Sequence, residues 1–157
     1  MEKIKKFLYL IFVILYSWEF VSIFAFGFIF IFYKQYLNFV VLKVNFNADL
    51  IKYLILLPIS IFIWILKEVK DMVVLEKDNI KFLVNWPNYW KFKIHLLVSI
   101  IYGFIFIVFS TIPWVRKENI SDALGLALFF EALLGMIIVA SSIYFAQISL
   151  KEIFNKD

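Results

Sequence analysis

The sequence contains no cysteine and, among its 157 residues, only one histidine, three prolines and four glycines. Without cysteine, disulfide bonds, thiolate nucleophiles and cysteine-ligated metal sites are excluded. A single histidine excludes a metal site built from several histidines, and neither H-E-x-x-H nor G-x-S-x-G occurs. The glycines are well separated, so there is no glycine-rich loop to bind phosphate. We therefore expect a protein that is not an enzyme and that uses no metal or cofactor.

Charge is also scarce, because 18% of the residues are charged and 64% are hydrophobic. An ordinary soluble domain is roughly 45–50% apolar. Intrinsic disorder is excluded by the 20 Phe, 8 Tyr and 5 Trp residues. Lipid is therefore the expected surroundings of most of the chain. The bias toward Phe, Ile, Lys and Asn is typical of an AT-rich bacterial genome, so we expect the cell membrane, and specifically a bacterial inner membrane.

Four long apolar stretches lie at about 7–33, 48–67, 88–115 and 123–150. A bilayer core of roughly 30 Å needs about 20 apolar residues in a helix. The stretches are continuous rather than short and alternating, which favours helices over the strands of a membrane barrel. The predicted fold is an all-α integral membrane protein with four transmembrane helices in one small bundle, a single domain over 1–157.

The second stretch is the weakest of the four. Only 14 residues separate Lys52 from Lys67, about 21 Å of helix, so both lysines must extend toward the interface for the segment to cross. A re-entrant segment is the alternative. Pro58 lies inside this stretch and predicts a kink, with Ser60 near the released carbonyls.

The positions of Lys and Arg predict the orientation. Eleven lie in the N-terminus, the loop 67–93 and the C-terminal tail, against five in the other two connections. Both termini and the loop 67–93 are therefore expected in the cytoplasm. The first apolar stretch is too long for a signal peptide, so we expect it to be retained. No basic cluster with interleaved aromatics lies on a soluble element, so nucleic-acid binding is not expected.

The segments between the spans leave alternatives open. In the loop 67–93, either the preceding helix continues to about Leu75, or residues 72–76 pair with 80–84 as a hairpin. The segment 34–52 is either extended or an interfacial helix. Trp86, Tyr89 and Trp90 are expected at the headgroup level as an aromatic anchor that starts the third span. The alternative is a docking surface for another protein.

Two carboxyls, those of Glu19 and Glu131, lie within the apolar stretches. A charge at bilayer depth costs at least about 2.5–3.5 kcal/mol, so such residues indicate a function or a helix contact. Counting residues from the nearest charged flanks places both at a similar depth. Tyr16 and Ser22 flank Glu19 at a spacing of three and are candidate hydrogen-bond donors to it.

Small and weakly polar residues share helix faces with these acids, and such faces allow helices to pack closely. One stripe, on the fourth span, contains Glu131 together with Ala127, Gly135, Ser142, Ala146 and Ser149. A second stripe, on the third span, contains His95, Ser99, Tyr102, Phe106 and Ser110. Ser99 and Gly103 form a pair of small residues on the same span. We expect both stripes to face the interior. We interpret His95 and Ser99, four residues apart, as structural rather than as a catalytic pair.

No Lys or Arg lies inside the spans to neutralise either acid. One interpretation is that Glu19 and Glu131 are protonated or hydrogen-bonded acids that join helices or subunits. The other is that they relay protons or cations. The corresponding functions are a non-enzymatic accessory or interaction subunit of a membrane complex and, as the alternative, an oligomeric ion or proton channel or transporter subunit. Both require a homo-oligomer or a larger membrane complex as well as the lipid bilayer.

Overall fold

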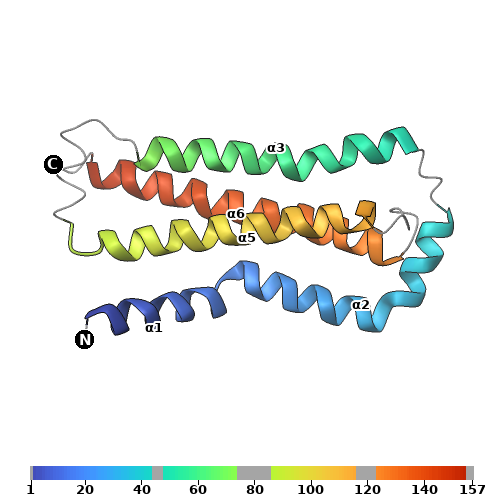
Figure 1. Cartoon of the computed structure of the whole chain (residues 1–157), viewed down its shortest axis with the longest axis horizontal. Coiled ribbons are helices and arrows are strands. Elements are labelled where there is room, and N and C mark those ends of the chain that lie inside the picture. Colours follow the sequence, from blue (N-terminus) through green and yellow to red (C-terminus); the bar gives the residue numbers. More distant parts are fainter. Residues whose placement is uncertain (1, 44–47, 74–85, 116–122, 155–157) are drawn as a thin grey trace.

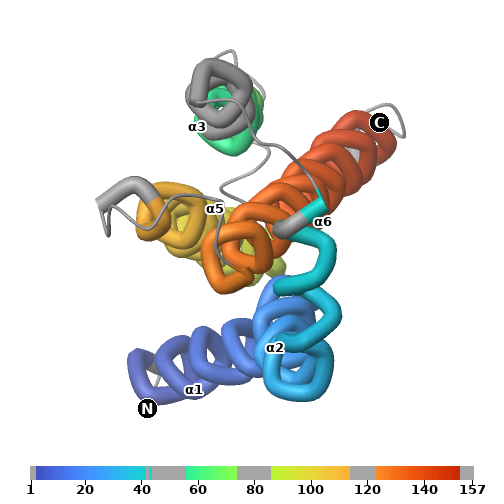
Figure 2. The backbone as a smooth tube through the Cα atoms, turned by 90° about the vertical axis from the view of Figure 1, so that its right-hand side faces the viewer, coloured from blue at the N-terminus to red at the C-terminus, as the bar shows by residue number. Residues whose placement is uncertain are grey.

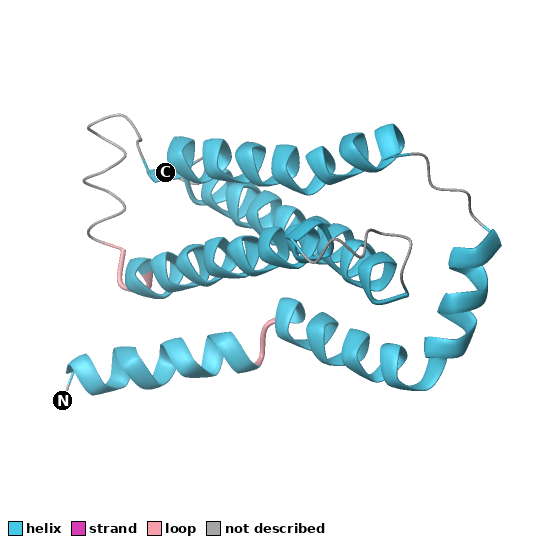
Figure 3. Ribbon diagram, turned by 45° about the vertical axis from the view of Figure 1, so that its right-hand side comes forward, coloured by secondary structure: helices cyan, strands magenta, loops and turns pink. Residues whose placement is uncertain are grey.

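The computed structural model describes residues 2–43, 48–73, 86–115 and 123–154. These residues form five helices and no strand: α1 (Glu2–Leu15), α2 (Trp18–Lys43), α3 (Ala48–Val73), α5 (Tyr89–Val115) and α6 (Ala123–Phe154) (Figure 3). Three segments of the described residues are long and apolar enough to cross a membrane: Trp18–Val41, Tyr89–Pro113 and Ala123–Glu152. The all-helical class and the membrane character of the chain therefore agree with the sequence.

The helices lie roughly along the long axis of the molecule. Figure 1 shows α1 and α2 end to end in one direction, followed by α3, α5 and α6 in alternating directions. The first turn of α1 and the last turn of α6 lie at the same end. Viewed along the axis, α5 and α6 occupy the centre, with α3 on one side and the α1–α2 pair on the other (Figure 2).

The first predicted span, 7–33, is wrong as a single helix. The chain leaves the helical conformation at Tyr16 and Ser17, so that two helices replace one. Nothing in the apolar pattern marks this point, because the residues on both sides are equally suited to lipid. The reason for the break is local, since Ser17 begins a new helix with its own side chain, as described below.

The structure also bears on two connecting segments for which the sequence left alternatives open. Residues 34–43 continue α2 as helix, so this part of the segment 34–52 is not extended. α3 continues through Pro58 to Val73, which favours the prolonged helix over a hairpin starting at residue 72. The rest of that hairpin, 74–85, lies outside the described residues. Ser60 donates to the carbonyls of Leu56 and Leu57 at 2.7 and 2.9 Å, in the turn around the proline.

The core lies where α5 and α6 meet α3. Phe106 of α5 and Met136 of α6 are fully buried, and so is Ile65 of α3. Phe106 lies directly against Gly135, where an added Cβ would overlap the ring. In lipid no hydrophobic force drives helices together, so close packing of this kind supplies much of the attraction between them.

Candidate functional site

The break between α1 and α2 is organised by Ser17. Its Oγ accepts a hydrogen bond from the backbone N–H of Phe20 at 3.1 Å, which makes Ser17 the N-cap of α2. The same hydroxyl donates to the carbonyl of Ile14 at 3.2 Å, in the last turn of α1. One small side chain therefore satisfies a free donor of one helix and a free acceptor of the other.

A neighbouring helix completes the hydrogen bonding of the break. The hydroxyl of Tyr102, on α5, donates to the same Ile14 carbonyl at 2.8 Å. Non-helical backbone at membrane depth is tolerated only where its polar groups are satisfied by protein or water. Ser17 and Tyr102 meet this requirement, and the break is consequently held against α5.

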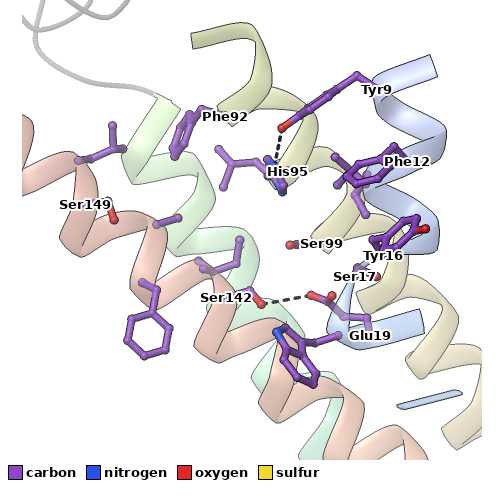
Figure 4. Close-up of a pocket in the computed structure, with 18 of the residues that line it drawn as sticks. Tyr9, Phe12, Tyr16, Ser17, Glu19, Phe92, His95, Ser99, Ser142 and Ser149 are labelled. Carbon is purple, nitrogen blue, oxygen red and sulfur yellow. Dashed lines mark hydrogen bonds between the residues drawn. The ribbon is translucent and has the colours of Figure 1, made fainter. Parts of the chain in front are cut away.

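Glu19 lies in the first turn of α2, where the free N–H groups of the helix make a negative charge favourable. Its side chain is only 4% exposed. Ser142 of α6 donates to its Oε1 at 3.3 Å, a long hydrogen bond (Figure 4). Ser142 lies ten residues before the end of the apolar α6 segment, whereas Glu19 is the second residue of the apolar α2 segment.

Glu131, on α6, is equally buried, with 4% of its surface exposed. Ser22 of α2 lies with its Oγ 3.0 Å from the Glu131 Oε1 and 2.9 Å from the backbone carbonyl of Glu19. The two acids thus face each other's helix rather than each other directly. Ser22 links them, because its hydroxyl touches one carboxyl and the backbone of the other acid.

A cavity of about 460 Å³ lies between α1, the start of α2, the first half of α5 and the last third of α6. Its volume is within the range of small-molecule sites. Glu19, Ser99 and Ser142 line one part of it, and His95 and Ser149 lie farther along it (Figure 4). The remaining walls are mostly aromatic and aliphatic side chains.

Tyr9 and His95 form a contact between α1 and α5 beside this cavity. The Tyr9 hydroxyl is 3.0 Å from the His95 Nε2. The Tyr9 ring also packs edge-on against Trp90, with ring centroids 5.1 Å apart. His95 is therefore engaged by Tyr9 and not aimed at Ser99. Within the described ranges, no group of three or more His, Asp or Glu side chains could hold a metal ion.

Comparison with protein-family models, curated proteins and solved structures finds no match to this chain.

The residues predicted from the sequence to be polar contacts or packing positions lie in different surroundings in the fold. Ser99 and Tyr102 are buried on the inner face of α5, and Gly103 lies against the Phe62 ring. Ala146 lines the cavity. Tyr16, a candidate donor to Glu19, is 75% exposed and stacks on Phe12 instead, because the break turns the end of α1 away from the face of Glu19.

The aromatic group at the start of α5 is only partly exposed. Trp86 lines the cavity and Trp90 packs on Tyr9. Tyr89 lies beneath the ammonium group of Lys93, whose Nζ is 4.5 Å from the ring centroid. These rings are thus engaged by the protein's own side chains, and their place at the headgroup level stays a prediction.

Sequence reasoning missed Ser17 and Tyr9, and it placed Ser142 on a packing face without giving it a role at Glu19. A signal for Ser17 was present, because a serine followed two residues later by an acidic residue is typical of a helix start. No comparable signal exists for Tyr9 or Ser142. Each meets its partner from a distant part of the sequence.

Proposed function

We propose that this protein is a non-enzymatic subunit of an oligomeric membrane channel or transporter, in which Glu19 and Glu131 handle protons or cations. One observation carries the proposal: two buried acids lie on facing helices, Ser22 contacts the carboxyl of Glu131 and the backbone carbonyl of Glu19, and the Glu19 side chain lines a cavity. Acids at membrane depth are costly and are retained mainly where they serve a function or a helix contact. Four helices enclose little space alone, so a pathway across the membrane requires several copies.

The proposal includes α3 as a fourth span and both termini in the cytoplasm of a cell membrane. α3 has 26 residues, about 39 Å of helix, which is sufficient to cross a bilayer core. The excess of Lys on the side of the termini supports the orientation. The common end of the first turn of α1 and the last turn of α6 is compatible with it.

The hydrogen bonds that Ser22 can form depend on whether Glu131 is protonated. The Ser22 hydroxyl has one hydrogen but lies within bonding distance of two acceptors, the Glu19 carbonyl and the Glu131 carboxyl. If Glu131 is protonated, its O–H donates to Ser22, and Ser22 donates to the Glu19 carbonyl. Both bonds then form at once. If Glu131 is ionised, the two acceptors compete for one hydrogen, so protonation and rearrangement at Ser22 are coupled.

The proposal is tested by proton and cation flux into liposomes that contain only the purified protein. We expect Glu19→Gln and Glu131→Gln each to lower the flux at least tenfold, because neither amide can gain or lose a proton. Glu152→Gln, which removes a charge from an exposed position of α6, is the matched control and retains the flux. Wild-type flux no greater than that of empty liposomes refutes the proposal, as does full flux in both buried variants.

An interaction subunit is the second candidate, and α2 is the observation that favours it. None of the most apolar window of this span is buried against the rest of the chain. Phe24, Phe28 and Phe32 are all largely exposed on it. Such a surface suits lipid or the helices of another subunit. A stoichiometric foreign membrane protein that copurifies in mild detergent, together with absent flux, would favour this function over transport.

A further inference from the structure

The cavity beside Glu19 has the features of a site for an organic ligand. We propose that it binds a hydrophobic monocation, an organic ammonium or phosphonium whose positive charge lies at Glu19 and whose apolar body lies among the aromatic walls. The inference names the substrate class of the proposed function, and it rests on that function for the role of Glu19 in transport.

The first argument is charge. Glu19 places a carboxyl in a mostly apolar cavity, at a helix start that favours its negative form. Among the described residues that line the cavity there is no lysine or arginine. The basic side chain on the wall, His95, is hydrogen-bonded to Tyr9. A cationic ligand would therefore supply the missing counter-charge.

The second argument is the spare bonding capacity of the carboxyl. Within the described part of the chain, the Glu19 carboxyl accepts one hydrogen bond, from Ser142 at 3.3 Å. A carboxylate has room for about four donors. Figure 4 shows the Glu19 side chain directed across the cavity toward Ser142, with Ser99 nearby. An ammonium group entering there would find a charged acceptor and two hydroxyls.

The third argument is the exposure of aromatic residues at the edge of the cavity. Tyr16 and Trp18 line the cavity from the break, and Phe145 lines it from α6. All three are mainly exposed, at 75%, 75% and 66%. They therefore border a lateral opening at the depth of Glu19, where lipid surrounds a membrane protein. Aromatic faces attract cations and also contact apolar groups, which suits a ligand that arrives from the bilayer with both.

The test measures binding of tetraphenylphosphonium to the purified full-length protein in detergent by isothermal titration calorimetry. Tetraphenylborate, which has the same shape and the opposite charge, is the ligand control. We expect saturable binding of the phosphonium, none of the borate, and at least tenfold weaker phosphonium binding to Glu19→Gln. Glu152→Gln, with the same change of net charge on an exposed surface, binds as the wild type does.

A second variant keeps the inference testable if Glu19→Gln does not fold. Ala146 lines the cavity one helical turn beyond Ser142, and Ala146→Trp fills space without changing charge. It is expected to abolish binding while the helical circular dichroism and gel-filtration volume stay unchanged. Equal binding of phosphonium and borate, or undiminished binding to both variants, overturns the inference. Binding without flux refutes only the proposed transport, and flux without binding refutes only the ligand class.

Discussion

A single hydroxyl at Ser17 determines how the N-terminal third of the protein is built. The side chain accepts from Phe20 and donates to Ile14, so the end of one helix and the start of the next are joined within a few residues. The start of α2 then falls next to Glu19. The position of this acid relative to the cavity is thus a consequence of a capping interaction.

This role predicts that Ser17→Ala destabilises the protein by about 1 kcal/mol, the usual cost of removing an N-cap side chain. The variant leaves the Phe20 N–H without its acceptor. Reversible unfolding in mixed micelles measures the change. Ser141→Ala is the matched control, because Ser141 is exposed and bonds only within its own helix, to Ile137. Equal unfolding free energies for the two variants would show that Ser17 does not cap α2.

At the scale of elements, the packing of α5 on α6 and on α3 depends on residues without side chains. Gly135 receives the ring of Phe106, and Gly103 receives that of Phe62. The small-residue faces recognised in the sequence are therefore places where rings approach a backbone. The periodic pattern identified the faces, but it could not identify the partner rings, which lie on other helices.

Gly135→Ala should destabilise the bundle by about 1–3 kcal/mol, because the new methyl overlaps the buried Phe106 ring and forces it to move. Gly27→Ala is the control, since a Cβ at Gly27 meets nothing within 4 Å. It should leave the stability unchanged or raise it slightly, because alanine favours helix more than glycine does. Thermal unfolding of both variants in one detergent separates the effects; a Gly135→Ala midpoint equal to that of Gly27→Ala would argue against the packing.

At the scale of the whole molecule, the number of crossings determines on which faces the ends lie. Four spans leave both ends on one face, whereas a re-entrant α3 would leave three spans and place the ends on opposite faces. The proposed topology is the first arrangement. The absence of cysteine makes the question accessible to single-cysteine labelling without background.

Lys5→Cys, Lys43→Cys and Lys151→Cys, made one at a time, test the topology with a membrane-impermeant maleimide. We expect Lys5→Cys and Lys151→Cys to react only in inverted vesicles, where the cytoplasmic face is outside. Lys43→Cys should react only in right-side-out vesicles. Labelling of Lys5→Cys and Lys151→Cys from opposite faces would refute the four-span topology and, with it, the common cytoplasmic location of the termini.

The sequence by itself determined a helical chain suited to lipid, the approximate bounds of α5 and α6, and the two acids within the apolar stretches. These follow from composition and from the length of apolar runs, which are local properties. The tertiary structure alone decided the contact of Tyr102 with the break, the contact of Glu19 with Ser142 and the cavity beside them. In a membrane helix the faces toward lipid and toward protein are both apolar, so periodicity does not separate them well. Hydrogen bonds between residues more than a hundred positions apart exist only once the helices have packed.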